Sequence, residues 1–259
     1  FFPRFLSKKA LFSEAFLKSF FPRFLSKKAL FVNAFSKGCL SGTIIFKNSN
    51  QRNYQMDDYK SETKQTYDSF PKEFDAKFED HFNKYVKAEA EYFSELVRDK
   101  RLKILDLGSG PGNHAAYFKR RGLDIICVDS SSEMVRLCKE KGLDARVMDI
   151  EQLDFQPKCF SGIWAYASLL HIPKANIQPV VSNLHKILRK NGIMAVALKE
   201  GRGEGLEADE RYPGTQRWFS YYTQEEVRDL FCNNGFKQIY SGKTILEKYT
   251  FLKQFFRKK

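Results

Sequence analysis

The chain has 259 residues, a net charge of +13 and 42% hydrophobic residues. This length suits one α/β domain with an extension, and no apolar run approaches the roughly 18 residues of a membrane span, so we expect no integral membrane association. Residues 1–55 carry ten Lys and Arg side chains but one acid, so most of the excess charge lies there. The basic composition therefore gives little indication of a nucleic-acid partner for residues 56–259.

The leader, residues 1–55, contains an internal repeat. Residues 1–12 recur without change at residues 20–31, and the first methionine of the chain is Met56. We expect Met56 to be the native start and the leader to be translated upstream sequence or a duplicated insertion. An Arg/Lys/Ser/Phe-rich targeting peptide and a basic amphipathic surface segment are the alternatives. We expect residues 1–55 to add nothing to the core of a domain formed by residues 56–259.

Residues 57–68 are polar, and an aromatic stripe follows them. Ser69 is placed to cap a helix that has Pro71 in its first turn. Apolar side chains then recur at helical spacing, at Phe74, Phe78, Phe82, Tyr85, Phe93 and Leu96. This pattern predicts helical packing of aromatic side chains on a core.

The most informative segment is residues 104–112, Ile-Leu-Asp-Leu-Gly-Ser-Gly-Pro-Gly. An apolar strand runs into Asp106 and then into Gly108, Gly110 and Gly112. Glycine permits a sharp turn and close approach of a ligand, and the helix expected over 113–121 directs backbone N–H groups toward that ligand. The spacing is G-x-G-x-G rather than the dinucleotide fingerprint G-x-G-x-x-G.

Strands and helices alternate after this loop. We expect strands at 103–108, 124–129, 144–149, 160–168, 192–199, 236–242 and 246–256. Continuous apolar runs such as 125–128 suit strands that are buried on both faces of a parallel sheet. The alternation predicts right-handed crossovers and a doubly wound sheet, with ligands at the carboxyl ends of the strands.

Helix boundaries are expected from capping residues. Ser130 with Glu133, and Thr223 with Glu226, have capping-box spacing. Apolar residues between 177 and 188 form one helical face, and we expect that helix to end at residues 191–192, Asn-Gly.

The glycine loop with Asp106 resembles the first motif of class I S-adenosylmethionine (SAM) dependent methyltransferases, and the resemblance extends over about residues 65–259. It implies a Rossmann-like, mostly parallel seven-stranded sheet with an antiparallel C-terminal strand. It implies SAM as cofactor and S-adenosylhomocysteine (SAH) as product, but its motifs name no substrate. We expect a small-molecule acceptor, because the sequence shows no Asn-Pro-Pro-Tyr type motif, no cysteine pair with nucleophile spacing and no added RNA-binding domain. The residues that the resemblance assigns to the cofactor are Asp106, Gly108, Ser109, Gly110, Asp129, Ser130, Met134, Asp149, Ile150 and Ala165.

The roles of these residues differ. Asp129 ends the second strand, where a carboxylate can accept hydrogen bonds from ribose hydroxyls. Asp149 resembles the family's adenine-amino acceptor, and Ile150 would cover the ring, although the usual proline of that motif is missing. For Met134, packing on adenine and filling of the core are equally open, and for Ser130 helix capping is favoured over a ligand contact.

The segment 160–171 resembles the fourth-strand motif of the family, with Ser161 in place of the usual acid. Ala165 would pass the methionine portion of the cofactor. His171 falls just beyond the strand; a substrate contact or packing is favoured over a role as general base.

Substrate selection is expected from residues 199–222, which are rich in glycine, arginine and aromatic residues. We interpret them as a mobile loop of the length often kept for lids, suited to an anionic or planar substrate, with an ordinary surface connection as the alternative. The N-terminal helices would form a lid over the cofactor, as the resemblance implies.

Three other functions remain open: methylation of RNA or protein, a NAD(P)-dependent oxidoreductase, and a non-catalytic SAM-binding module. The glycine spacing disfavours the oxidoreductase. The chain has one Tyr-x-x-x-Lys motif, Tyr249 to Lys253, and it falls in the expected last strand rather than on a helix in the middle of the chain. Five cysteines at 39, 127, 138, 159 and 232 form no C-x-x-C pair, and the four histidines show no ligand spacing. We therefore expect a reduced, cytoplasmic protein without a metal site.

Overall fold

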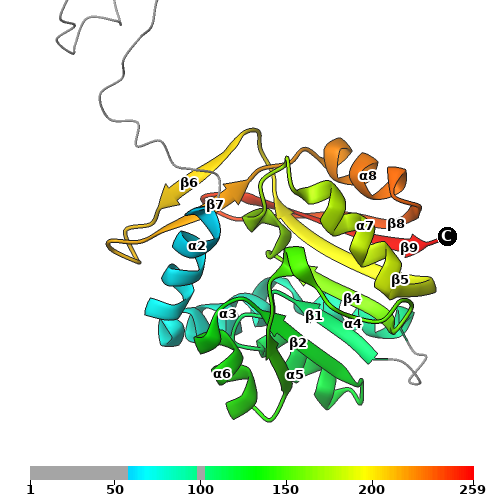
Figure 1. Cartoon of the computed structure of the whole chain (residues 1–259), viewed down its shortest axis with the longest axis horizontal. Coiled ribbons are helices and arrows are strands. Elements are labelled where there is room, and N and C mark those ends of the chain that lie inside the picture. Colours follow the sequence, from blue (N-terminus) through cyan, green and yellow to red (C-terminus); the bar gives the residue numbers. More distant parts are fainter. Residues whose placement is uncertain (1–57, 98–102) are drawn as a thin grey trace, which may run out of the picture. The chain divides into compact units, whose positions relative to one another are not determined.

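The computed structural model describes residues 58–97 and 103–259 (Figure 1). The helices are α2 (Asp58–Ser69), α3 (Pro71–Tyr85), α4 (Lys87–Leu96), α5 (Asn113–Arg120), α6 (Ser132–Glu140), α7 (Ile177–Ile187) and α8 (Gln224–Asn233), with 3-10 turns η1 (Ile150–Gln152) and η2 (Leu169–His171). The strands are β1 (Lys103–Leu107), β2 (Ile125–Asp129), β3 (Asp144–Val147), β4 (Phe160–Tyr166), β5 (Leu188–Lys199), β6 (Glu204–Ala208), β7 (Gln216–Ser220), β8 (Phe236–Ile245) and β9 (Thr250–Lys258).

Seven of these strands form one sheet in the order β3-β2-β1-β4-β5-β9-β8. The pairs among β1 to β5 are parallel, and β9 is antiparallel to both of its neighbours, β5 and β8. The predicted doubly wound sheet with an antiparallel C-terminal strand is confirmed. The chain order reverses between β1 and β4, and at such a switch point the connections after neighbouring strands diverge and leave a crevice at the carboxyl ends.

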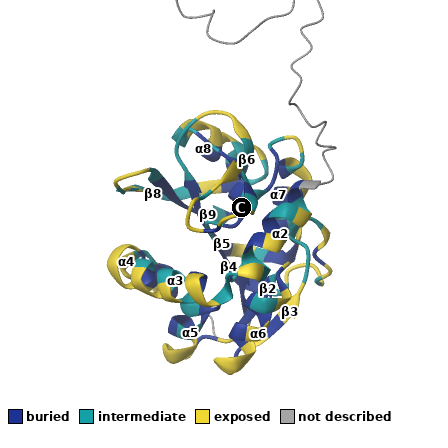
Figure 2. Ribbon diagram, turned by 90° about the vertical axis from the view of Figure 1, so that its left-hand side faces the viewer, coloured by how far each residue is buried: buried dark blue, intermediate teal, exposed yellow. Residues whose placement is uncertain are grey.

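The alternation of side chains along each strand divides the core in two. On β2, Ile126 and Val128 lie in the apolar cluster that includes α7 and α8, whereas Ile125 and Cys127 lie in the cluster that includes α4, α5 and α6. Both faces of the sheet are therefore covered by helices, which explains the continuous apolar run in the sequence. Figure 2 shows the result, with exposed residues on the outer surfaces of the helices and buried central strands between them.

Several predicted boundaries are wrong. Ser69 is the last residue of α2, and the N-cap of α3 is Phe70, whose side chain makes no capping hydrogen bond, with Pro71 in the first turn. The helix α7 ends at Ile187 rather than at residues 191–192, since β5 begins at once at Leu188. The pairing of β5 with β4, in which Leu188 is opposite Phe160, outweighs the local stop signal.

The N-cap of α6 differs by one position from the prediction. Ser131, not Ser130, is the N-cap and accepts a hydrogen bond from the Met134 N–H at 3.1 Å. The second predicted capping box, Thr223 with Glu226 at the start of α8, is confirmed.

The polar segment before the aromatic stripe is helical, as α2. Its buried side chains Tyr59, Thr63 and Thr66 lie on one face. Thr66 Oγ1 donates to the Gln216 carbonyl at 2.8 Å, and the Trp218 N–H donates to Thr63 Oγ1 at 3.0 Å. These bonds attach α2 to β7, so a helix with little apolar surface is held by polar contacts.

The predicted leader and the expected start at Met56 lie outside the described residues. Within 58–97 and 103–259, no helix combines the length and apolar character needed to cross a bilayer. The same residues contain no group of three or more His, Cys, Asp or Glu side chains arranged to hold a metal ion.

Replacing Phe93 by alanine tests how firmly α4 holds the sheet. The Phe93 side chain is fully buried, its ring centroid lies 5.1 Å from that of Trp164, and it fills the space beside Gly162. We expect Phe93→Ala to lower the free energy of unfolding by about 3–5 kcal/mol, because the cavity cannot close around the missing ring. Urea denaturation followed by circular dichroism measures this loss.

The matched control is Ile245→Ala, which truncates a side chain that is 81% exposed on β8. It should change the free energy of unfolding by less than about 0.5 kcal/mol. Equal losses in the two variants would show that α4 is not a stabilising layer.

Candidate functional site

The glycine loop, residues 108–112, joins β1 to α5 and is attached to the end of β2. The N–H groups of Gly108 and Ser109 donate to the Val128 carbonyl at 2.8 and 3.0 Å. Gly108 has φ +66°, and a Cβ there would lie 2.4 Å from Ser168 Cβ. The loop therefore needs glycine at this position both for its backbone conformation and for its contact with the segment after β4.

The third glycine sets the start of α5. Gly112 is the N-cap residue with φ +83°, and a Cβ on it would meet Leu143 Cδ1 at 2.6 Å and Cys138 Sγ at 2.8 Å. Close packing of the loop against α6 and the segment before β3 thus depends on the absence of a side chain.

Asp129 connects the loop to the next helix. Its Oδ2 accepts from the Gly110 N–H and its Oδ1 from the Ser131 N–H, both at 2.9 Å. Each carboxylate oxygen keeps a second lone pair, so the group can still accept hydrogen bonds from a ligand. Burial raises the pKa of Asp129 to about 6, against the opposing effect of these backbone hydrogen bonds.

Asp106 lies deeper than Asp129. It is 2% exposed, and its Oδ2 has no hydrogen-bond partner among the described residues. Burial, with the neighbouring Asp129 charge, raises the pKa of Asp106 to about 8. Near pH 7 the pair therefore carries about one negative charge, mainly on Asp129.

A cavity of about 690 Å³ opens above the loop. Among the residues predicted for the site, its wall includes Gly108, Ser109, Gly110, Asp129, Ser130, Ile150 and His171. The structure thus brings together the glycine loop and the segments that follow β2, β3 and β4, as expected from the topology.

Four predicted cofactor residues do not line this cavity: Asp106, Met134, Asp149 and Ala165. Met134 is fully buried in a cluster that includes Phe74, and Ala165 is fully buried within the sheet. The Asp149 carboxylate caps η1 and lies 2.7 Å from the Lys60 ammonium. Of the two open interpretations of Met134, the structure favours the core.

His171 has both ring nitrogens engaged. Its Nδ1 lies 2.6 Å from the Trp218 carbonyl, which can only accept, so Nδ1 carries the proton. Its Nε2 then accepts from the Tyr67 hydroxyl at 2.9 Å. Burial and the nearby Arg217 charge lower the pKa of His171 to about 3. Neither nitrogen of this ring is therefore free to accept a proton from a ligand.

The segment 199–222 borders the cavity as expected, but it is not a simple mobile loop. It contains the antiparallel hairpin β6–β7, in which Leu206 pairs with Trp218. The strand propensity of Trp218 and Phe219, together with the bonds from α2, outweighs the glycine content that suggested a loop.

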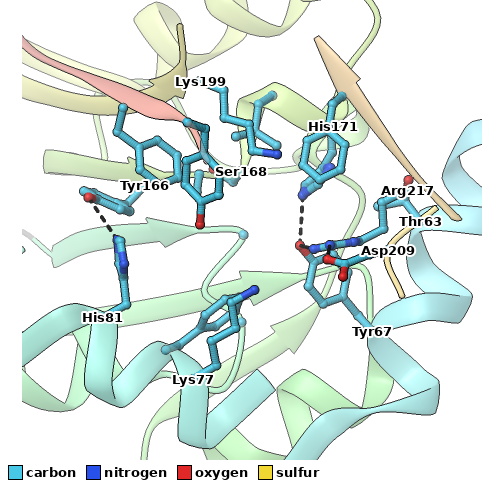
Figure 3. A pocket seen from close by; sticks show the side chains of 18 of the residues that line it. Thr63, Tyr67, Lys77, His81, Tyr166, Ser168, His171, Lys199, Asp209 and Arg217 are labelled. Atoms are coloured by element: carbon cyan, nitrogen blue, oxygen red, sulfur yellow. Dashed lines mark hydrogen bonds and ion pairs between the residues drawn. The ribbon is translucent and has the colours of Figure 1, made fainter. Parts of the chain in front are cut away.

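Figure 3 shows side chains that line the cavity, among them Asp209 and Arg217 of the hairpin segment. Arg217 is 7% exposed; it donates to Asp209 Oδ2 at 3.1 Å, and Arg211 donates to the same oxygen at 2.6 Å. Lys77 from α3 and Lys199 from β5 also line the cavity. The loop side of the site therefore carries Asp129. The hairpin side carries cations and acids together: Lys199, Arg211, Arg217, Glu200, Glu207, Asp209 and Glu210.

Sequence reasoning missed the contribution of α2 to the cavity. Thr63 and Tyr67 line it, and Asp68 Oδ1 accepts from Ser131 Oγ at 2.6 Å. The usable signal was the helical spacing of the residues at 59, 63 and 66, although that part of the chain is polar.

The predicted aromatic stripe divides on α3. Phe74 and Phe82 are buried, whereas Phe78 and the nearby His81 line the cavity. The N-terminal helices therefore border the cavity with one part of this face and pack on the core with the other.

Comparison with known proteins agrees with this geometry. Residues 104–192 match the family model described as a methyltransferase domain. A malonyl-[acyl-carrier protein] O-methyltransferase of Pectobacterium atrosepticum is 30% identical over 135 residues, 51% of this chain and 52% of the relative. The chain spans about half the length of the curated relatives that it matches.

Solved structures share the fold. The DhpI–SAH complex superposes with a TM-score of 0.61 at 16% identity, over 79% of this chain and 98% of the other. The 1,6-didemethyltoxoflavin-N1-methyltransferase of Burkholderia thailandensis, solved with 1,6-didemethyltoxoflavin and SAH, gives a TM-score of 0.52 at 22% identity, over 73% and 90% of the two chains.

The bonding of His171 predicts that its ring does not titrate near neutral pH. Protonation would place a buried cation next to Arg217, so we expect the ring to stay neutral from pH 5 to pH 8. NMR of the full chain labelled with 15N-histidine measures this, with His171→Gln to assign the signals. A titration midpoint near 6.5 for His171 would contradict the arrangement.

Proposed function

We propose that this chain, which belongs to the class I SAM-dependent methyltransferase superfamily, transfers a methyl group from SAM to a small-molecule acceptor. The observation that carries the proposal is a cavity in which the glycine loop and Asp129 form one wall and the β6–β7 hairpin forms the opposite wall. Such a cavity can bring a cofactor and an acceptor together.

The residues of the loop side fit the cofactor. Gly108 and Gly110 offer a backbone cradle in which an added Cβ would press against Ser168 or Phe78. Asp129 would accept hydrogen bonds from the ribose hydroxyls with its remaining lone pairs, and Ile150 would cover the adenine.

Asp149 is a poorer candidate for the adenine amino group. Its carboxylate already pairs with the Lys60 ammonium and accepts from the Glu151 N–H at 2.9 Å. A cofactor amino group would have to compete with these partners.

SAM supplies an activated methyl group on a sulfonium, so the chain must mainly position the reactants and exclude water. Well-oriented reactants gain about 7–11 kcal/mol from proximity, whereas a general base adds only about 10²–10⁴-fold. The engagement of both His171 nitrogens is therefore compatible with catalysis. His171 and Tyr67 would fix the wall against which the acceptor rests.

The acceptor side favours a small molecule. The cavity is bordered by α2, α3 and the hairpin and has a volume of about 690 Å³, which supports an acceptor group of limited size beside the cofactor. Two of the similar proteins are named for a malonyl group on an acyl-carrier protein and for 1,6-didemethyltoxoflavin, and in both names the group to be methylated is small. RNA or protein is the alternative acceptor.

A cytoplasmic location stays a prediction from cysteine usage.

An oxidoreductase gains no support from Tyr249 and Lys253. Tyr249 lines the cavity, but Lys253 does not. The Lys253 ammonium is buried, where it donates to Glu89 Oε1 at 2.7 Å and to the Tyr85 carbonyl at 2.5 Å. The two residues therefore do not form a shared site.

Replacing Asp129 tests the cofactor site. We expect Asp129→Ala to weaken SAH binding by about tenfold or more, since hydrogen bonds to a charged group contribute about 1.5–3 kcal/mol. Isothermal calorimetry on the full chain measures the affinity, with Asp144→Ala, an exposed acid on β3, as the control. Because the pKa of Asp129 is raised to about 6, binding by the unmodified chain should weaken as the pH falls below 6.

Two results would count against this assignment. One is unchanged SAH affinity in Asp129→Ala with an unchanged melting temperature. The other is tight binding of NADH in the absence of any heat from SAH.

A second experiment identifies the class of acceptor. The full chain is incubated with tritiated SAM and a cell extract separated into small molecules, RNA and protein. We expect label in the small-molecule fraction, and Asp129→Ala should abolish most of it. Label confined to RNA or protein would replace the proposed acceptor class.

A further inference from the structure

We propose that Lys199 forms an anion-binding subsite for the carboxylate of an aromatic or similarly planar acceptor, and that Lys77, on the other side of the cavity, adds a second positive charge. This inference rests on the proposed methyl transfer and specifies the acceptor. Both lysines line the cavity, Lys199 from the end of β5 and Lys77 from α3 (Figure 3).

Both ammonium groups are available to a ligand. Among the described residues, no carboxylate oxygen lies within 4.0 Å, the limit for an ion pair, of the Lys199 or Lys77 ammonium group. By contrast, Lys60, Lys141 and Lys253 each have such a partner. The two side chains are half-buried. Two such charges in one cavity favour an anion.

Both lysines remain largely charged near neutral pH. Burial lowers the pKa of each to about 8. The nearby cations Arg211 and Arg217 lower both further, while Asp209 opposes this effect at both lysines and Glu207 opposes it at Lys199. At pH 7 most of each population is therefore protonated, and a bound carboxylate would raise that fraction.

Three of the four acids that line the hairpin side of the cavity, Glu200, Glu207 and Asp209, are already engaged; Lys243 donates to Glu200 Oε1 at 2.5 Å. Asp209 accepts from both Arg211 and Arg217. The carboxylate of Glu207 accepts from the Tyr221 hydroxyl at 2.8 and 2.9 Å. The arginines are therefore neutralised in part by Asp209, while the lysines keep their charge for a ligand.

Aromatic rings surround Lys199 and indicate the shape of the ligand. Its Nζ lies 3.5 Å from the centroid of Phe219, 5.0 Å from that of Tyr249 and 5.7 Å from that of Tyr221. The rings hold the ammonium group by cation–π attraction and offer flat apolar surfaces beside it. A ligand that is planar and bears its negative charge at one end matches both features.

The opposite end of the cavity is already assigned. In the proposed function, Asp129 and the glycine loop hold the sugar and base of the cofactor, which leaves the hairpin side for the acceptor.

The competing explanation is that the lysines bind the carboxylate of the cofactor itself. The experiment separates the two by comparing SAH with 5′-methylthioadenosine, which lacks that carboxylate.

The test is calorimetry on the full chain saturated with SAH. The probes are benzoate, cinnamate and indole-3-acetate, each compared with its amide, and phenyl phosphate. We expect at least one acid to bind about tenfold more tightly than its amide, because a carboxylate gains charge-assisted hydrogen bonds that an amide lacks.

Variants locate the binding of the acid. Lys199→Met and Lys77→Met should each remove about tenfold of that affinity, while Lys199→Arg retains most of it. Lys139→Met, which removes the same charge from the exposed end of α6, is the control. The melting temperature of each variant is measured alongside, so that a loss of binding is separated from a loss of folding.

Each contrary outcome has one meaning. If SAH itself fails to bind, the proposed function falls and the subsite falls with it. Three outcomes, each with SAH still binding, would overturn the carboxylate subsite while the proposed function stands. The acids bind no better than their amides, phenyl phosphate binds best, or folded lysine variants bind the acids with unchanged affinity. If the lysine variants weaken SAH but not 5′-methylthioadenosine, the lysines hold the cofactor and the subsite is overturned.

Discussion

The site depends on one carboxylate that joins two backbone segments. Asp129 accepts from Gly110 in the glycine loop and from Ser131 at the start of α6. The loop needs acceptors for its N–H groups, because its positive φ angles prevent regular pairing. With the Val128 carbonyl bound to Gly108 and Ser109, the end of β2 fixes the loop before any ligand arrives.

The second organising element is α2, which links the two walls of the cavity. Asp68 contacts Ser131 beside the glycine loop, while Thr63 and Thr66 bond to the backbone of β7. These contacts use short polar side chains with defined geometry. A helix with little apolar surface can thereby hold the hairpin and the loop at a constant separation, which an enzyme for two substrates requires.

Sequence reasoning succeeded for the elements whose cause is local or periodic. Apolar runs such as 125–128 are sufficient to indicate buried strands, and the glycine spacing is sufficient to indicate the tight turn between β1 and α5. What escaped prediction depends on partners distant in the chain. Helix α2 is polar and gains its bonds from β7, about 150 residues away. The hairpin was interpreted as a loop for the same reason, since α2 provides the bonds that hold β7.

Some helix boundaries escaped prediction for a related reason, because they depend on contacts between residues that are distant in the chain. Ser130 and Ser131 are equally suited to cap a helix, and the bond from Ser131 to Asp68 is a contact that no local pattern reveals.

The two buried acids of the site, Asp106 and Asp129, together carry about one negative charge near neutral pH. A cation bound in the cavity beside Asp129 would favour the ionised form of both acids, so its binding would release protons into the buffer. The heat of such binding then varies with the ionisation enthalpy of the buffer chosen.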